Sequence, residues 1–173
     1  MSLVLAAAAY GQNYHKFKAG LAFGLTQVTN PILALETAYR LSDAFAIGVR
    51  FETTSDATKG YVSEQSISSI TINSQYYFSA KKVRPFIGAG LGQYFIAGRY
   101  DDIPKKFGFY PRLGIDMGHA SLSLEYNMLP STSVDSDVFY LDANGVYHSL
   151  TDTFTFSYLG IKIGFFVGGG KKG

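Results

Sequence analysis

The feature that most constrains this chain is a period-two alternation of apolar and polar residues, which recurs in eight segments between Phe17 and Phe165. Successive residues of a β-strand belong to opposite faces, so each segment predicts a strand with one apolar and one polar face. None of these segments carries the apolar stripe of an amphipathic helix. The chain is therefore predicted to be all-β. The apolar positions are every second residue of Phe17–Leu25, Leu33–Leu41, Phe45–Phe51, Ile70–Phe78, Ile87–Phe95, Phe109–Met117, Leu122–Met128 and Leu159–Phe165.

The two predicted faces differ in kind, because the apolar face contains no charged residue. The charged residues of the opposite face are Lys18, Glu36, Arg40, Arg50, Glu52, Arg112, Asp116, Glu125 and Lys162. Five of these are basic and four are acidic. A set so nearly balanced can pair internally, as buried charge requires. Most of the glycines in these segments, including Gly88, Gly90 and Gly92, lie on this charged face as well.

Two architectures accommodate such a chain. A soluble barrel turns its apolar face inward, whereas an outer-membrane barrel turns it outward to lipid and encloses the polar face. Short and long connections alternate between the segments, as periplasmic turns and external loops do in membrane barrels. Glycine weakens an exposed strand, but in a narrow lumen it makes room for large neighbours such as Arg50, Arg112 and Tyr94. We therefore predict that residues 12–173 form an eight-stranded antiparallel up-and-down transmembrane β-barrel, with termini in the periplasm and four external loops.

The charged face is expected to line the lumen of this barrel. Eight strands leave no aqueous channel of useful width, so the nine charges are predicted to form a salt-bridged network that plugs it. Aromatic girdles are expected at both edges of the lipid-facing band. They would comprise Phe17, Tyr39, Phe45, Phe78 and Phe165 on one side, and Phe51, Phe95, Phe109 and Tyr126 on the other.

Four motifs carry a family resemblance, and together with the alternation it extends over nearly the whole chain after Gln12. They are the segments Asn73–Phe78, Arg84–Gly92, Pro111–Asp116 and Tyr158–Phe166. In these the chain resembles the small eight-stranded outer-membrane barrels of Gram-negative bacteria, of the OmpX and OmpA transmembrane-domain type, and most of all the PorT-like outer membrane protein β-barrel domain. The resemblance implies a fold and a membrane rather than a chemistry. One departure is the tail after Phe166, since many such proteins end on the aromatic residue that the insertion machinery reads.

The first residues have the character of a processing segment. The apolar run Leu3–Ala9 is short and rich in alanine, and Ala9 and Gly11 fit the small-x-small rule for signal peptidase. A charged n-region is missing, so residues 1–11 are interpreted as the remnant of a truncated signal peptide. The alternative is an ordinary apolar strand or helix. A signal peptide would imply that the mature protein is exported.

Composition excludes several kinds of chemistry. The chain contains no Cys, which rules out disulfides, zinc sites built on Cys and a thiol nucleophile. Its formal net charge of +2 makes nucleic acid an unfavoured partner. No cofactor and no metal site are predicted, because Asp135 and Asp137 are far short of a calcium shell. His148 beside Ser149 leaves a membrane-embedded lipid-modifying enzyme as one alternative, without an identifiable oxyanion element.

The last external loop, Pro130–Asp152, contains four Asp and no Lys or Arg. Its Asn144–Gly145 pair, between two strand-forming runs, predicts a β-hairpin. That hairpin would either continue the flanking barrel strands or offer an exposed edge to a partner. The candidate contact residues are Phe139, Tyr140, Tyr147 and Asp142.

The function predicted from these observations is non-enzymatic. It is a structural or adhesion-type surface-interaction role, exercised through the external loops of a monomeric barrel in the outer membrane. The expected partners are outer-membrane lipid, the barrel-insertion machinery and an extracellular protein or surface. A soluble lipocalin-like carrier is the further alternative, and it would require Ile161 and Ile163 to lie inside and Arg50, Glu52, Arg112 and Glu125 outside.

Overall fold

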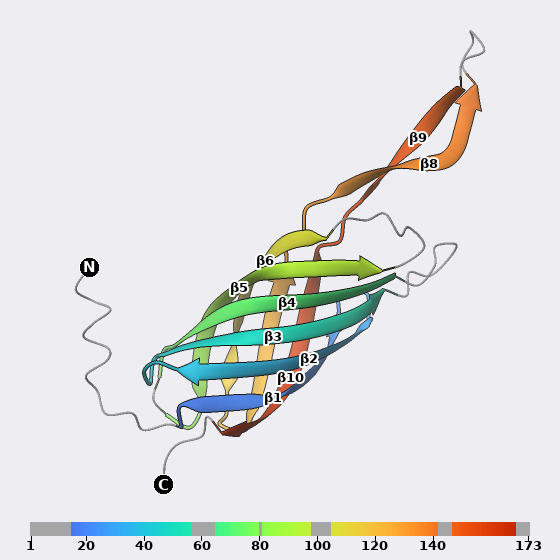
Figure 1. Ribbon diagram of the computed structural model, residues 1–173. Coiled ribbons are helices and arrows are strands. Elements are labelled where there is room, and N and C mark those ends of the chain that lie inside the picture. The colour runs from blue at the N-terminus through green and yellow to red at the C-terminus, as the bar shows by residue number, and fades with distance from the viewer. Residues whose placement is uncertain (1–14, 57–64, 80, 98–104, 142–146, 169–173) are drawn as a thin grey trace, which may run out of the picture.

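The described residues form ten strands in this computed structural model, which describes residues 15–56, 65–79, 81–97, 105–141 and 147–168. Eight strands close into one barrel in the order β1-β10-β7-β6-β5-β4-β3-β2 (Figure 1). The remaining two, β8 and β9, form a separate two-stranded sheet. The strands are β1 (Phe17–Thr26), β2 (Pro31–Arg40), β3 (Phe45–Asp56), β4 (Gln65–Tyr77), β5 (Arg84–Ala97), β6 (Lys106–Asp116), β7 (Ala120–Asn127), β8 (Thr132–Leu141), β9 (Tyr147–Phe154) and β10 (Tyr158–Gly168).

Every neighbouring pair in the barrel is antiparallel, and the barrel is closed by β1 and β10, where Leu21 lies opposite Phe165. Consecutive barrel strands are adjacent in space, so the topology is up-and-down. This confirms the predicted all-β fold and its eight-stranded closed barrel. The described part of the chain contains no helix long and apolar enough to cross a membrane.

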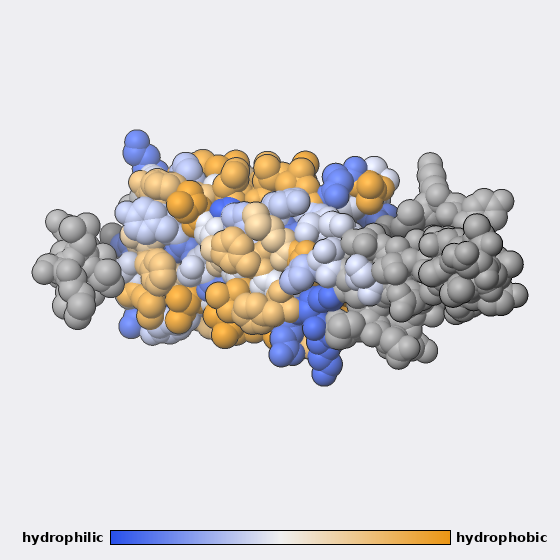
Figure 2. Space-filling model, turned by 90° about the horizontal axis from the view of Figure 1, so that it is seen from above, coloured by the Kyte–Doolittle hydropathy of each residue, from blue (hydrophilic) through white to orange (hydrophobic). Residues whose placement is uncertain are grey.

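The alternation of the sequence becomes an apolar exterior and a polar interior. Ile161, Ile163 and Phe165 on β10 are 56%, 51% and 60% exposed, while their neighbour Lys162 is only 2% exposed. Figure 2 shows apolar side chains gathered along the flank of the barrel. Most of the expected girdle residues are exposed on this flank, namely Phe17, Tyr39, Phe78, Phe165, Phe51, Phe109 and Tyr126, whereas Phe45 and Phe95 are half-buried. The soluble-carrier alternative requires the opposite arrangement.

The two ends of the barrel differ in their connections. One end, here called the terminal end, holds the start of β1, the finish of β10 and the short connections 41–44, 78–83 and 117–119. The other, here called the loop end, holds the four-residue turn Gln27–Asn30, the longer connections and the β8–β9 sheet. Several strands extend further toward the loop end than the alternation predicts, with β4 starting at Gln65 and β6 at Lys106. Polar residues such as Ser66 and Ser68 continue the strand pairing there. They lie outside the apolar alternation from which the strands were predicted.

The predicted hairpin exists as a sheet of its own, which we call the β8–β9 hairpin. It pairs Leu141 with Tyr147 and Thr132 with Phe154, and a register shift between Asp135 and Phe139 marks a bulge in β8. Figure 1 shows the hairpin projecting from the loop end, well beyond the rim of the barrel. It is not a continuation of the barrel ladder, because the connecting residues 128–131 and 155–157 interrupt the strands on both sides.

Candidate functional site

The interior of the barrel is the best-defined polar site in the molecule. All nine charged side chains singled out in the sequence lie there, each no more than 5% exposed: Lys18, Glu36, Arg40, Arg50, Glu52, Arg112, Asp116, Glu125 and Lys162. Arg84 joins them at 1% exposed. The alternation of strand residues carries them inward, since each lies next to an exposed apolar residue in the sequence.

Asp116 organises the charges at the terminal end. Its Oδ2 atom lies 2.6 Å from Lys18 Nζ and 3.7 Å from an Arg40 guanidinium nitrogen. The Gly118 backbone N–H donates a 2.8 Å hydrogen bond to its Oδ1 atom, which ties the carboxylate to the β6–β7 turn. The Tyr77 hydroxyl lies 3.3 Å from the same carboxylate. Asp116 therefore joins β1, β2, β4 and β6 at this end.

Glu36 and Arg112 form the middle of the interior. Arg112 donates a 2.5 Å hydrogen bond to Glu36 Oε1, and its Nε atom lies 2.9 Å from Glu125 Oε1. The Gln75 amide donates to Glu36 Oε1 at 3.1 Å, while Gln75 Oε1 accepts from the Tyr77 hydroxyl at 2.7 Å. Gln75 and Tyr77 thereby connect the middle of the interior to the Asp116 group.

Glu125 and Glu52 anchor the half of the interior toward the loop end. Glu125 pairs with Arg50, with Arg112 and, at 2.6 Å, with Lys162 Nζ. Glu52 pairs with Lys162 and lies 3.3 Å from Arg50 Nε. These contacts form one continuous set of ion pairs and hydrogen bonds from Lys18 to Glu52, which we call the lumen network.

The lumen network crosses the barrel rather than following its wall. In the closed strand order β3 stands opposite β7, and β2 stands opposite β6. The Arg50–Glu125 pair joins the first of these couples, and the Glu36–Arg112 pair joins the second. Ion pairs placed in this way brace walls that share no backbone hydrogen bonds.

Aromatic rings and glycines complete the packing of the interior. The Arg50 guanidinium lies 3.8 Å from the centre of the Tyr110 ring, and Lys18 Nζ lies 3.8 Å from that of Phe166. A Cβ atom at Gly90 would lie 2.3 Å from the Tyr110 ring, so any larger residue there would force that ring to shift. Gly90 thus provides the kind of space that the sequence predicts for lumen glycines.

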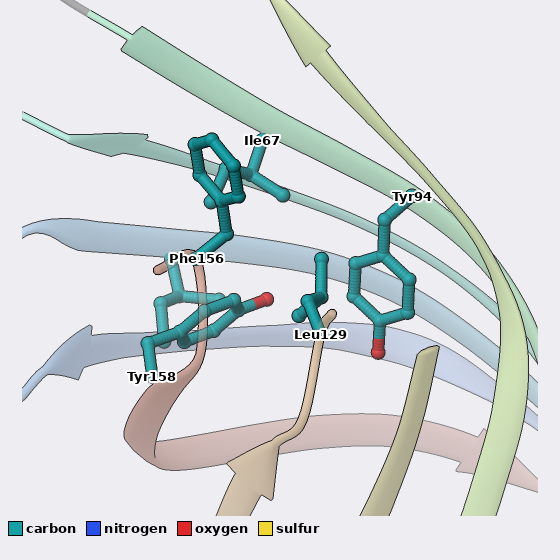
Figure 3. Packing of buried hydrophobic residues seen from close by; sticks show 6 residues of the cluster. Ile67, Tyr94, Leu129, Phe156 and Tyr158 are labelled. Atoms are coloured by element: carbon teal, nitrogen blue, oxygen red, sulfur yellow. The ribbon is translucent and has the colours of Figure 1, made fainter. Parts of the chain in front are cut away.

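An apolar cluster closes the network at the loop end, and Figure 3 shows its side chains meeting inside the barrel. It consists of Ile32, Ile67, Tyr94, Leu129, Phe156 and Tyr158. Two of its rings also reach the polar interior, because the Tyr158 hydroxyl donates to Glu52 at 2.7 Å and that of Tyr94 donates to Asn127 at 2.7 Å. The cluster therefore separates the charges from the loop end.

Leu129 and Phe156 come from the two connections that lead into the β8–β9 hairpin. The Ser157 hydroxyl holds these connections together, accepting from the Leu129 N–H at 3.0 Å and lying 3.2 Å from the Leu129 carbonyl. The base of the hairpin is thus seated in the mouth of the barrel. Sequence reasoning missed these residues, because they lie outside the alternating segments and carry no periodic signal.

Arg84 is the charged lumen residue that the sequence prediction omitted. It donates to the backbone carbonyls of Asp43 at 2.6 Å and Ser79 at 3.2 Å, and it stacks 4.0 Å from the centre of the Tyr77 ring. It lies at the first position of β5, just before the recognised alternation begins at Ile87. In this segment the odd-numbered residues from Ile87 onwards face outward. Continuing the same alternation back to residue 84 would have placed Arg84 inside.

The external-loop candidates are only partly described. The hairpin register places Phe139 opposite Ser149 and Tyr140 opposite His148, next to the Leu141–Tyr147 pair. Asp142 lies outside the described residues, as does the predicted signal-peptide remnant at 1–11. Within the described ranges, no group of three or more His, Cys, Asp or Glu side chains is placed to hold a metal ion.

Several solved structures are similar to this chain. The outer membrane protein OprG from Pseudomonas aeruginosa superposes with a TM-score of 0.58 at 15% sequence identity, covering 91% of this chain and 98% of that one. The N-terminal β-barrel domain of OprF from the same organism gives 0.48 at 13% identity, covering 91% and 99%. Ail, the attachment invasion locus protein of Yersinia pestis, gives 0.42 at 9% identity, covering 91% and 100%. No family model and no curated protein sequence matches this chain.

The likeness to OprG shows that the chain has the fold of a small outer-membrane barrel. The exterior agrees independently, because a closed barrel with a continuous apolar flank and a charged interior suits lipid rather than water. Closure pairs every barrel strand with two neighbours, which leaves no sheet edge to be desolvated in a bilayer. The predicted membrane-spanning outer-membrane β-barrel architecture is therefore confirmed.

Proposed function

We propose that this protein is a non-enzymatic outer-membrane barrel that acts as a surface-interaction, adhesion-type protein through the β8–β9 hairpin. The observation that carries this proposal is the hairpin itself, a separate sheet that stands beyond the barrel rim. A two-stranded sheet leaves one edge of each strand without a partner strand, and such edges can accept a strand from another protein.

The partner that suits this hairpin is basic. Between Pro130 and Asp152 the sequence holds four Asp and no Lys or Arg. Complementary charge steers a partner toward such a surface and favours it over acidic alternatives. The bulge in β8 interrupts the straight course of that strand, and bulges discourage strand addition. The unbulged β9 is therefore the edge that supports pairing with an extended partner segment.

We propose that the lumen is closed and conducts nothing. The lumen network fills its centre, and the apolar cluster around Tyr94 and Phe156 covers the charges at the loop end. The enzymatic alternative has less support, because it rests only on the adjacency of His148 and Ser149 in the sequence, where no oxyanion element is identifiable.

Cell adhesion tests the role of the hairpin. Bacteria that display the full chain are expected to adhere to plates coated with an extracellular-matrix extract several-fold better than bacteria displaying a variant with residues 132–154 replaced by a Gly-Ser linker. A variant with residues 57–64 replaced instead provides the matched control and should adhere like the full chain. Equal adherence of the full chain and the hairpin variant would contradict the proposal. The heat-dependent gel mobility of folded barrels verifies that both variants fold.

Planar-bilayer recordings test the closed lumen independently. The purified full chain should produce no steady current steps. Reproducible steps that vanish when the barrel is heat-unfolded would show an open pore and would contradict the closed lumen.

A further inference from the structure

The outer face of the barrel is hollowed along β1 and β10. This groove has a volume of about 470 Å³ and lies over apolar side chains that include Phe23 and Leu25 of β1 and Ile161 and Ile163 of β10. The register brings these residues together, since Phe23 lies opposite Ile163 and Leu25 opposite Ile161. The volume lies within the range of roughly 300–1,000 Å³ that is common for small-molecule sites.

The groove follows the strands from the middle of the barrel toward the loop end. Its walls belong to the apolar flank, with each of the four facing side chains about half exposed. A strand rises about 3.3 Å per residue, so the path from Phe23 to the β1–β2 turn is on the order of 13 Å or more. An elongated apolar groove in a lipid-facing surface suits a hydrocarbon chain lying along the strands.

The rim of the groove at the loop end is polar, and its backbone is held by hydrogen bonds. Thr26, Gln27 and Thr29 line it. The Gln27 N–H donates to the Leu159 carbonyl at 3.0 Å, and the Gln27 side-chain oxygen accepts from the Leu159 N–H, which ties the turn to β10. Thr29 has a φ of 67°, a left-handed conformation that is rare for a β-branched residue. The turn is therefore held in a defined, strained shape at the rim.

The rim carries hydrogen-bonding groups but no charge. None of the described residues that line the groove is Lys, Arg, Asp or Glu. A phosphate head would call for basic side chains, because recognition of that group relies on Arg or Lys. Hydroxyl and amide groups instead suit an uncharged head that can both donate and accept hydrogen bonds.

We propose that this groove binds one hydrocarbon chain of a lipid with an uncharged, hydroxyl-bearing head, of the monoacylglycerol class. The hydrocarbon chain lies along β1 and β10, and the head meets Gln27 and Thr29 at the rim. The proposal stands on the barrel exterior alone and is independent of the role of the β8–β9 hairpin.

The chain contains no Trp, which permits a site-specific fluorescence test. Phe23→Trp places a reporter in the groove, and Phe51→Trp places a matched one elsewhere on the flank. The two phenylalanines are similarly exposed, at 52% and 47%. Each folded variant is reconstituted in phosphatidylcholine vesicles that contain increasing mole fractions of a monoacylglycerol with a dibrominated chain, which quenches Trp on contact.

The Phe23→Trp variant should reach half-maximal quenching at a mole fraction at least about threefold below that of the Phe51→Trp variant, which corresponds to about 0.7 kcal/mol. Adding Leu25→Tyr to the Phe23→Trp variant should fill the groove and remove this difference. Dibrominated phosphatidylglycerol should quench both reporters equally. Identical monoacylglycerol curves for the two reporters, a preference that survives Leu25→Tyr, or a preference for phosphatidylglycerol at the groove would each overturn the proposal.

Discussion

Replacing Arg112 by Ala tests whether the lumen charges are buried and depend on one another for compensation. The Arg112 side chain is only 3% exposed and pairs with Glu36 at 2.5 Å and Glu125 at 2.9 Å. Alanine removes both contacts at once. Glu125 would keep Arg50 and Lys162, so its charge would stay compensated. Glu36 would lose its ion pair and keep the Gln75 amide at 3.1 Å as its remaining described hydrogen bond, so it would become a buried carboxylate with no cation in direct contact.

The size of the loss follows from that uncompensated charge. Removing one partner of a buried ion pair costs about 3–5 kcal/mol, most of it from the charge left behind. Arg112→Ala should therefore lower the free energy of unfolding by about 3–5 kcal/mol. Replacing the unpaired Glu36 carboxylate by a neutral amide should restore part of the lost free energy of unfolding. The double variant Arg112→Ala, Glu36→Gln is expected to recover about 0.5–3 kcal/mol, because the two residues are in direct contact.

Urea unfolding in lipid vesicles measures these changes. The fraction folded is followed by the heat-dependent gel mobility of the barrel and by tyrosine fluorescence. The matched control is Lys16→Ala, which removes an exposed cation next to the start of β1 and should change stability by less than about 0.5 kcal/mol. A loss at Arg112→Ala no larger than that of the control, or strict additivity of the two lumen substitutions, would refute the reasoning.

Two further substitutions test the packing of the interior by the same urea assay. Gly90→Ala should destabilise the barrel by about 1–3 kcal/mol, because its Cβ would lie 2.3 Å from the Tyr110 ring. Gly160→Ala, whose Cβ meets only the tip of a flexible side chain, should cost clearly less, and equal losses would contradict the packing argument. Phe156→Ala should lower stability by about 3–5 kcal/mol by emptying the cluster at the barrel mouth. Ile163→Ala on the lipid-facing flank should have a much smaller effect, and the reverse order would mean that the hairpin base is not seated in the barrel.

Sequence alone predicts the barrel well, because the alternation within each short segment already shows which side chains face the lipid and which face the lumen. The parity of Ile161, Lys162 and Ile163 assigns each residue to a face before any partner strand is known. The number of alternating segments and the sorting of short and long connections then determine closure and topology. The β8–β9 hairpin was likewise visible in the Asn144–Gly145 signal between two strand-forming runs.

The pairing inside the lumen could not be predicted from the same signal. That Arg112 meets Glu36 and Glu125 depends on which strands oppose one another and on how far the closed sheet is staggered. Strand order alone places β2 opposite β6, but it leaves the vertical level of each side chain open. The seating of Leu129 and Phe156 was hidden for a different reason, since an irregular connection has no periodicity that could mark a residue as inward.

The lumen charges also specify the register of the barrel, whatever their net contribution to stability. A slip of one residue in any strand would turn its inward residues outward, because side chains alternate with period two. On β3 such a slip would bring Arg50 and Glu52 to the lipid face and take Phe51 inside. An Arg or Lys facing lipid near the bilayer midplane costs about 2–4 kcal/mol, and its former partner would be stranded in the lumen. Because Arg50 and Glu125 join opposite walls, a slip in either strand is penalised on both sides of the barrel. Backbone pairing alone would tolerate a shifted register. Charges that give little net stability as ion pairs can therefore still exclude shifted registers.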